Sequence, residues 1–524
     1  MSDAPVAAQA TPSRWIRLLN SPLPAALIFL YLAFLFGRVH LGTEGLYERD
    51  GYFHARFAQQ FADQGLSRSF PYTQFSTWKE QFCDKEFLFH ALMWPFARPA
   101  AEPLAGVRVF MLLLDLSFCL AVYLILRRNQ VPAPWAFVFL LACLGGPFLI
   151  RLTMIRSHVL SMLLAAIGVH LLIGKRWKWL LALGFLYAWS YTVPLVLVMI
   201  AVPFVLGAWW AGGGLDWKSP ASALAGVVLG LIVHPFSPQT LETFATYIDV
   251  ISMGAQGKND AALELGKEIY PYSTRSFLHA FPLWTALVLA LPLLALRIRA
   301  AIRPETLGAL AAALAWFGMT LLFSRFMEYA IPLFVLALGL LVRDWSAGLE
   351  LRERFAAAHP RATVAAGLGV ALVLSAFHAL SADFYLASQR ELPPPRFAQA
   401  SAWMARNLEP GETVVNLWWD DFPELYYSAP RQRYLVGLDP TYMLRYDAEK
   451  ARLLEEMRTQ RAPLDGPLLA RTFGARYMVL RADVARTYPE LGDRTWGYVH
   501  KDDYAVIYAL DGPEGRRVPA QAGD

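Results

Sequence analysis

The 524-residue chain has few charged residues and very few cysteines. Only 17% of its residues are Asp, Glu, Lys or Arg, whereas 56% are apolar and 14% are aromatic. This composition excludes an ordinary soluble globular protein. The three cysteines, Cys83, Cys119 and Cys143, match neither a disulfide framework nor a zinc motif in their spacing. We expect them to be packing residues.

The N-terminal region lacks the pattern of a cleavable signal peptide. Arg14 and Arg17 precede an apolar run from Pro22 to Val39, and no small-residue cleavage pattern follows closely. We therefore expect residues 1–21 to form a cytoplasmic tail. The net charge of +5 is explained first by basic loops on the cytoplasmic side of a membrane protein, so we infer no nucleic-acid partner.

Long apolar runs, in contrast, recur along most of the chain. They lie near residues 22–39, 104–126, 133–150, 158–174, 178–191, 193–210, 221–236, 277–296, 305–323, 327–342 and 362–380. Each is close to the length that crosses a bilayer, so we expect a polytopic α-helical membrane domain of about eleven transmembrane helices over residues 22–380. Tyr191 to Pro194 could be a tight turn between two spans or a kink in one long helix.

The basic residues indicate how these spans are oriented. If every run is a span, one side collects Arg14, Arg17, Arg127, Arg128, Lys175, Arg176, Lys178, Lys218, Arg297, Arg299, Arg303, Arg343, Arg352 and Arg354. That side is expected to be cytoplasmic. The long loops 40–103 and 237–276 then face outward and carry Asp50, Asp84, Glu86, Asp249, Asp260, Glu264 and Glu268. A bacterial inner membrane, with these loops in the periplasm, fits the pattern.

Beyond residue 380 the composition changes to that of a small domain. A Pro394-Pro395 break precedes an expected helix at 396–407, strands at 413–417, 433–436 and 476–480, a helix at 446–459, and a hairpin pairing 496–500 with 504–510. Such alternation predicts an α/β domain over residues 381–524. With eleven spans before it, this domain lies on the outer side.

The stretch from Glu48 to Arg56 directly follows the first span and carries the strongest candidate, Asp50. Ionisable groups at a membrane boundary are costly and are usually kept for a function. We interpret Asp50 as a catalytic residue at the mouth of a membrane-embedded active site. The alternative is that Asp50 only caps a helix that begins just after it.

A second cluster in the same outer loop is Asp84-Lys85-Glu86, followed by His90. The spacing of Glu86 and His90 places both on one helical face. Asp50, Asp84 and Glu86 together could bind Mg²⁺ or Mn²⁺, which prefer oxygen ligands. They could equally form a solvated loop.

Several further residues on the outer side could contact a substrate. Arg151, Arg156 and His158 lie between the third and fourth spans, where guanidinium groups would suit a phosphate or would snorkel to headgroups. The outer loop 258–276 contains Glu268. Arg325 begins the tenth span, where it could contact substrate or pair with Glu328 three residues later.

These residues resemble a known group of enzymes. They form three motifs: an acidic residue after the first span in Asp50-Gly51-Tyr52-Phe53-His54-Ala55-Arg56, the Arg325-Phe326 pair, and Trp418-Trp419-Asp420 at the start of the outer domain. In these three motifs the sequence resembles the GT-C superfamily, and most of all the oligosaccharyltransferase catalytic subunit. The resemblance implies transfer of a sugar from a polyprenyl-phosphate or polyprenyl-diphosphate donor. It also implies that Asp50 acts in catalysis or metal binding and that Trp418, Trp419 and Asp420 bind the acceptor.

The sequence departs from the oligosaccharyltransferase pattern at two places. The Trp-Trp-Asp motif continues with Asp421-Phe422 instead of Tyr-Gly, and Arg151, Arg156 and His158 occupy the loop where those enzymes carry a second acidic motif. We therefore infer the superfamily and not protein N-glycosylation. The expected acceptor is a glycolipid, a polysaccharide or a protein.

Within this hypothesis, Asp50 acts as general base or metal ligand, Asp84 and Glu86 support it, and the arginines neutralise the departing lipid phosphate. His54, Arg56 and His90 are expected to contact substrate. A transporter or flippase of lipid-linked sugars is the alternative, but such proteins usually carry internal repeats and midplane charges. Asp115 is the one acidic residue expected well inside a span. A third interpretation has the outer domain bind a glycan or partner through Asp420, Asp421, Glu424 and Asp439, although anchoring needs far fewer spans.

Overall fold

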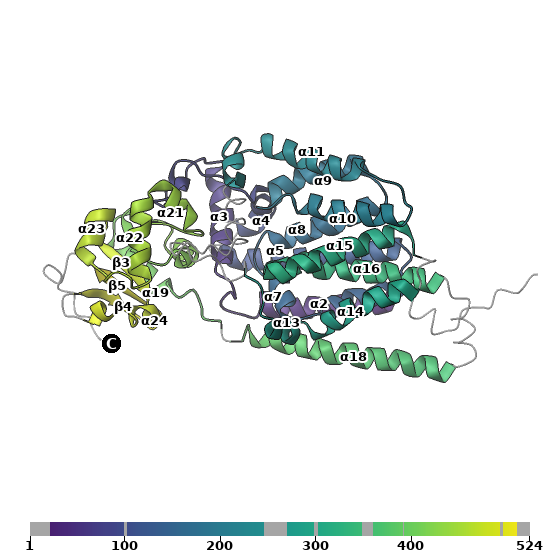
Figure 1. Ribbon diagram of the computed structural model, residues 1–524. Coiled ribbons are helices and arrows are strands. Elements are labelled where there is room, and N and C mark those ends of the chain that lie inside the picture. Colours follow the sequence, from purple (N-terminus) through teal and green to yellow (C-terminus); the bar gives the residue numbers. More distant parts are fainter. Residues whose placement is uncertain are drawn as a thin grey trace, which may run out of the picture.

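The computed structural model describes residues 21–98, 102–245, 270–297, 302–347, 360–390, 392–492 and 496–510. A helical bundle makes up most of it, and a smaller domain with a β-sheet packs against one end of the bundle (Figure 1). The expected N-terminal tail up to residue 20 and the candidate Glu268 lie outside the described residues.

The bundle contains the helices expected from the apolar runs. They are α2 (Pro22–His40), α5 (Pro103–Arg128), α6 (Pro134–Leu141), α7 (Gly146–Leu152), α8 (His158–Ile173), α9 (Trp177–Ser190), α10 (Val196–Trp210), α11 (Lys218–Ile232), α13 (Thr274–Ala280), α14 (Pro282–Arg297), α15 (Pro304–Leu322), α16 (Met327–Ala347) and α18 (Pro360–Ala387). Among the described residues, 5 helices are long and apolar enough to cross a membrane, or up to 7 if each bent pair counts as one span. The protein is thus a multi-pass membrane protein, and the count of about eleven spans remains a prediction.

Two of the expected spans are sharply bent. The run 133–150 forms α6 and α7 at an angle of 93°, and the run 277–296 forms α13 and α14 at 95°. In both cases a proline, Pro147 or Pro282, stands in the first turn of the following helix. Proline lacks the N–H that a continuing helix would need, so it starts the new helix in a new direction.

The ambiguous region near Tyr191 is a break between two helices. Helix α9 ends at Ser190, Tyr191 has an extended backbone, and α10 begins at Val196. The two helices also have different partners, because α9 packs mainly on α11 and α10 mainly on α15. The turn interpretation is therefore confirmed.

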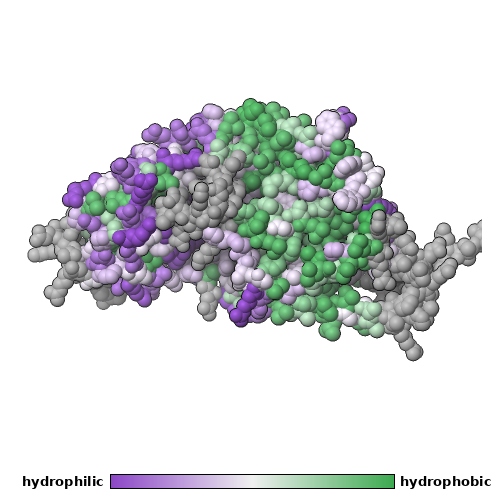
Figure 2. Space-filling view, in the orientation of Figure 1, coloured by the Kyte–Doolittle hydropathy of each residue, from purple (hydrophilic) through white to green (hydrophobic). Residues whose placement is uncertain are grey.

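The surface of the bundle is apolar, as expected for contact with lipid. Figure 2 shows hydrophobic residues over the bundle and hydrophilic residues over the smaller domain. Helix α18 lies at the edge of the bundle beside α7 (Figure 1). Only 6% of the most apolar 18-residue stretch of α18 is buried inside the protein, so most of this helix is available to lipid.

The C-terminal domain is α/β, as the sequence predicts. Its strands are β1 (Thr413–Asn416), β2 (Arg433–Tyr434), β3 (Tyr477–Arg481), β4 (Tyr498–Lys501) and β5 (Ala505–Ala509), in the order β2-β1-β3-β5-β4. Strand β1 pairs in parallel with β2 and β3, while β5 pairs in antiparallel with β3 and β4. The helices are α19 (Ala398–Asn407), α20 (Phe422–Ser428), α21 (Thr441–Tyr446), α22 (Ala448–Arg458), α23 (Gly466–Phe473) and α24 (Ala482–Ala485).

The first outer loop is built into this domain. It carries α3 (Asp50–Gln64), η1 (Thr77–Lys79) and α4 (Phe87–Ala97). The Tyr434 N–H donates to the Tyr72 carbonyl (2.8 Å) and the Gln74 N–H donates to the Tyr434 carbonyl (2.7 Å), so this loop extends the sheet at β2. One buried aromatic cluster joins the two parts and includes Phe53, Phe57, Phe70, Trp78, Phe82, Phe422, Tyr426 and Tyr434. The loop and the domain therefore share a core.

Helix α5 shows where the basic residues at its C-terminal end lie relative to the C-terminal domain. Its start lies next to that domain, because the Tyr427 hydroxyl donates to Glu102 (2.6 Å) just before Pro103. It ends at Arg127 and Arg128 after 26 residues, which is about 39 Å along a helix. These arginines and the C-terminal domain are thus at opposite ends of the bundle, as the predicted topology requires.

Candidate active site

A cavity of about 1240 Å³ lies where the bundle meets the C-terminal domain. Its walls come from the first outer loop, the turn between α7 and α8, the segment 270–282, η4 (Ser324–Phe326), α18 and η5 (Trp419–Asp421). The chain thus closes this space with segments that are far apart in the sequence. The packing of α3 on α20 and of α4 on α3 brings the first outer loop to the rim.

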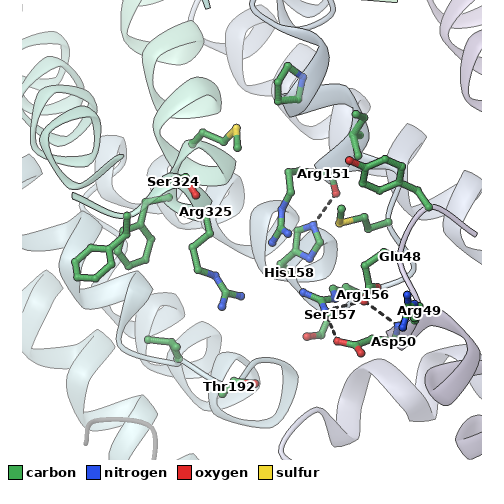
Figure 3. Close-up of a pocket in the computed structure, with 18 of the residues that line it drawn as sticks. Glu48, Arg49, Asp50, Arg151, Arg156, Ser157, His158, Thr192, Ser324 and Arg325 are labelled. Atoms are coloured by element: carbon green, nitrogen blue, oxygen red, sulfur yellow. Dashed lines mark hydrogen bonds and ion pairs between the residues drawn. The ribbon is translucent and has the colours of Figure 1, made fainter. Parts of the chain in front are cut away.

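Asp50 lies on the polar wall of this cavity, in an ion pair with Arg156 (Figure 3). Helix α3 begins at Asp50 itself, its N-cap position is Arg49, and the Arg49 side chain makes no capping hydrogen bond. The capping interpretation of Asp50 is therefore wrong. The carboxylate instead faces the arginine that follows α7.

Glu48 is a second carboxyl on the same arginine, and it is not among the residues predicted from the sequence. Its Oε1 accepts from Arg156 Nη2 (2.8 Å) and from the backbone N–H of Asp50 (2.8 Å). Its Oε2 is buried without a hydrogen-bond partner. Burial is the main cause that raises the pKa of Glu48 to about 7. The negative charge of Asp50 also raises this pKa, whereas the positive charge of Arg156 lowers it. Only its position next to Asp50 could have pointed to it.

Arg151, His158 and Arg325 also line the cavity. Arg151 Nε donates to Glu328 Oε1 (2.6 Å), and the Arg151 carbonyl and His158 Nε2 are 2.6 Å apart. Arg325 points toward the same space from the opposite wall (Figure 3) and donates to the Tyr191 hydroxyl (3.2 Å). Glu328, expected as a partner of Arg325, thus pairs with Arg151, which is 177 residues away in the sequence.

The residues proposed as metal ligands are brought together only in part. Asp84 accepts from His90 Nδ1 through both oxygens (2.9 Å each). Asp50 is held by Arg156 instead. Among the described residues, the group whose ligand atoms lie together is His54, Glu86 and His90, within 4.8 Å of one another. Glu86 is the member shared with the predicted set, and two histidines stand where Asp50 and Asp84 were expected.

Two of the expected substrate contacts lie outside the cavity lining. Arg56 donates to the Tyr427 carbonyl through Nε (3.0 Å) and Nη2 (2.7 Å), so it holds α20 against α3. The ring of Trp418 is covered by Arg458 (4.6 Å) and Arg481 (5.2 Å) inside the C-terminal domain. Trp419 and Asp420 do line the cavity.

Lys85 is a further cation at the cavity that was noted in the sequence only as part of its cluster. Burial acts to lower the pKa of its ammonium group, but Tyr442 and the carboxylate of Glu86 outweigh burial and raise the pKa. Lys85 therefore stays charged. The signal that could have found it is a lysine between two acidic residues in an outward loop.

The far side of the cavity is apolar and borders the lipid-facing helix α18. Phe377, Leu380 and Phe384 of this helix line it, together with Leu278 of α13. Leu380 and Phe384 are also largely exposed on the outer surface. The cavity thus combines a polar end, lined by both basic and acidic side chains, with an apolar wall, which suits a ligand with a polar, charged head and a hydrocarbon chain.

No protein-family model matches the sequence, and no curated protein matches it either. Solved structures with a similar fold do exist. The oligosaccharyltransferase of Archaeoglobus fulgidus, tethered with an acceptor peptide containing the NVT sequon, aligns with a TM-score of 0.59 at 13% identity, covering 95% of this chain and 76% of that one. ArnT from Cupriavidus metallidurans bound to undecaprenyl phosphate aligns at 0.55 and 16% identity, covering 94% and 98%.

A third structure, the arabinofuranosyltransferase AftD from Mycobacteria, aligns with a TM-score of 0.51 at 15% identity. The alignment covers 96% of this chain but only 40% of AftD. All three are GT-C glycosyltransferases. At these identities the likeness concerns the fold, and it confirms the GT-C-like architecture that the sequence predicts.

Proposed function

We propose, from the GT-C fold of this chain and its amphipathic cavity, that the protein is a membrane glycosyltransferase. The donor is a sugar or glycan on a polyprenyl phosphate or diphosphate, and the acceptor is a hydroxyl group of a glycolipid, polysaccharide or protein on the outer side. The membrane is a bacterial inner membrane, with the C-terminal domain in the periplasm.

One observation carries this proposal: the cavity joins a polar end, where Arg156, Arg325 and Lys85 lie among carboxylates that include Asp50, to an apolar wall on α18. A lipid-linked donor has the same two parts, a phosphate and a hydrocarbon chain. Arg325 and Lys85 supply positive charge for the phosphate, whereas the charge of Arg151 is balanced by Glu328. The apolar wall lets the chain remain in contact with the bilayer while the phosphate reaches the polar end. The undecaprenyl phosphate bound to ArnT, which has a similar fold, supports this choice of ligand.

The reaction follows from the groups at the polar end. The acceptor hydroxyl attacks the anomeric carbon, a new carbon–oxygen bond forms, and the bond from the anomeric carbon to the donor phosphate breaks. Asp50 takes the proton of the acceptor hydroxyl, and Arg156 holds its carboxylate in place. The phosphate leaves with an additional negative charge, which Arg325 and Lys85 stabilise.

The transporter alternative has less support. Asp115, the acidic residue inside α5, pairs with His40 at 2.8 Å and is fully buried. Neither residue lines the cavity. A buried pair of this kind is accounted for by packing of α2 on α5.

The test is transfer of radiolabelled sugar by the purified protein from a set of polyprenyl-phosphate and polyprenyl-diphosphate donors to an extract that contains glycolipids, polysaccharides and proteins. We expect labelled product from at least one donor. Movement of intact donor across proteoliposomes with no transfer from any donor would overturn the enzyme and establish a transporter.

A further inference from the structure

The side chains of His54, Glu86 and His90 converge at the wall of the cavity. His54 comes from the second turn of α3, Glu86 precedes α4, and His90 lies one turn into α4. His54 Nδ1 and His90 Nε2 are 2.9 Å apart, and His54 Nδ1 is 3.9 Å from Glu86 Oε2. We propose that these three residues bind a transition-metal ion of the Zn²⁺ class.

The separations suit such an ion. In a tetrahedral zinc site with bonds of about 2.0–2.1 Å, ligand atoms lie roughly 3.3 Å apart. The distances of 2.9 Å between His54 and His90 and 3.9 Å between His54 and Glu86 fall on either side of this value. Two imidazoles and one carboxylate favour zinc and its neighbours over Mg²⁺ or Ca²⁺, which prefer oxygen alone. Three protein ligands leave a position for water or another oxygen ligand.

The surrounding residues are arranged like the outer shell of a metal site. Both oxygens of Asp84 lie 2.9 Å from His90 Nδ1, so that nitrogen carries the proton and Nε2 presents its lone pair to the site. Glu86 Oε1 accepts from the hydroxyls of Ser157 (2.7 Å) and Thr192 (3.2 Å). These bonds orient the carboxylate so that Oε2 faces His54.

The charge and burial of the cluster also favour a cation. His54 and His90 are 5% and 1% exposed, and the ring of Phe57 packs against His90 at 4.7 Å. Asp84 and Glu86 add two carboxylates to this apolar setting and Lys85 adds one positive charge, so a bound cation would offset the remaining negative charge.

A bound ion would link the two helices of the first outer loop. Asp50 is one turn before His54 on α3, so the ion would fix the start of α3 and the place of the Asp50 carboxylate. This site does not depend on the proposed function. The competing arrangement is a hydrogen-bond relay in which His54 donates to His90 and His90 donates to Asp84, with no ion.

The experiment is metal analysis of the purified full-length protein, followed by stripping with a chelator and titration with Co²⁺, which reports tetrahedral ligands by its visible d–d absorption. We expect one tightly held Zn²⁺ per chain and a Co²⁺ spectrum that Zn²⁺ abolishes. His54→Ala and His90→Ala should lose the spectrum, and Asp84→Asn should keep it with affinity weakened about 10–100-fold.

The matched control is His500→Ala. His500 also pairs with an aspartate, Asp502, at 2.9 Å, but it lies in the C-terminal domain on β4. It should retain wild-type Zn²⁺. Stripped wild-type protein that binds no Co²⁺ stoichiometrically, or variants of His54 and His90 that bind it as the wild type does, would overturn the proposal in favour of the relay. The wild-type measurement decides even if a variant fails to fold.

Discussion

Glu48 and Asp50 are two carboxyl groups on one guanidinium, that of Arg156, and they differ in environment. Glu48 has a buried Oε2 without a partner, whereas 27% of the Asp50 side chain is exposed. Two acidic groups in unlike surroundings commonly take unlike roles. In this site, Asp50 is the more exposed of the two on the cavity wall, and Glu48 holds the N-terminus of α3 and Arg156 together.

Replacing Glu48 by Gln should change how stability depends on pH. Because burial raises its pKa from 4.5 to about 7, the folded state binds more protons than the unfolded state between these values. Folding stability therefore falls as pH rises through this window. The melting temperature of the wild type should fall relative to that of Glu48→Gln over the window and then stay level. Glu80→Gln, at an exposed position, is the control and should run parallel to the wild type. Parallel curves for Glu48→Gln would contradict the assignment.

Arg325 should act on donor binding. It faces the cavity across from Arg151, and a charge-assisted hydrogen bond to phosphate contributes roughly 1.5–3 kcal/mol. Arg325→Ala should raise the KM for the donor by about tenfold or more, and Arg325→Lys should restore part of it. The control is Arg303→Ala, since Arg303 is half exposed and outside the cavity. An unchanged KM for the donor would remove Arg325 from the phosphate site.

The site residues differ in how far the sequence could predict them. Asp50, Arg156 and Arg325, which line the cavity, were singled out because charges next to spans are unusual on the outer side. The pairing of His54 with His90 was not, since 36 residues separate them and only the packing of α3 on α4 brings them together. Arg56 was assigned to substrate because it follows Asp50, but six residues along α3 place it on another face, against Tyr427.

At the scale of elements, an ion network holds the first outer loop to the C-terminal domain. Arg49, next to Asp50, contacts Asp420 (2.9 Å) and Asp421 (2.8 Å). Arg481 contacts Asp421 (2.9 Å) as well. Burial raises the pKa of Asp421 to about 7 despite the charges of Arg481 and Arg49. Asp421, which departs from the family motif, thus serves as a buried partner for these cations.

Arg49→Ala should loosen this junction. Arg49 is 27% exposed and Asp421 keeps its contact with Arg481, so we expect the loss of the charge-assisted hydrogen bonds of Arg49 to cost about 1.5–3 kcal/mol. We expect a lower melting temperature and faster limited proteolysis between α18 and α19. Arg476→Ala is the matched control, since Arg476 pairs with Glu412 on the surface and should change stability by about 1 kcal/mol or less. Equal effects of the two variants would contradict a buried network.

The elements of the C-terminal domain were predicted better than those of the membrane bundle. Strand β1 and the β4–β5 hairpin were visible as short runs of β-branched and aromatic residues bounded by turn residues. In the bundle, hydropathy shows that a run is apolar but says nothing of the direction of the helix axis. The bends of 93° and 95° within two of the runs were therefore not predicted. The local signals, Pro147 after two glycines and Pro282 after Phe281, could have indicated them.

At the scale of the whole molecule, the basic ends and the C-terminal domain lie on opposite sides, which can be tested by labelling. The native cysteines Cys83, Cys119 and Cys143 are all buried, so the background should be low. Asp483→Cys, in α24 and 77% exposed, should react with a membrane-impermeant maleimide in intact spheroplasts. Arg128→Cys should react only after permeabilisation. The reverse pattern would invert the topology.

The arrangement of the whole could be predicted only in outline. The sequence separates an apolar part from a later α/β part, and it places charged loops between them. It does not show that residues 72–75 extend the sheet at β2, or that Phe53 and Phe422 share one core. Contacts of this kind depend on three-dimensional packing across more than 350 residues, for which periodicity has no signal.

The most direct measurement of the central claim is the rate of sugar transfer from the polyprenyl donor by the wild type beside Asp50→Asn. We expect the variant to fold with an unchanged melting temperature and to lose about 10²- to 10⁴-fold in kcat, since the amide cannot accept the proton. Asp447→Asn is the control, because Asn caps α22 as well as Asp does and the residue lies outside the cavity. Transfer by Asp50→Asn at the wild-type rate would contradict the claim that Asp50 is the catalytic base.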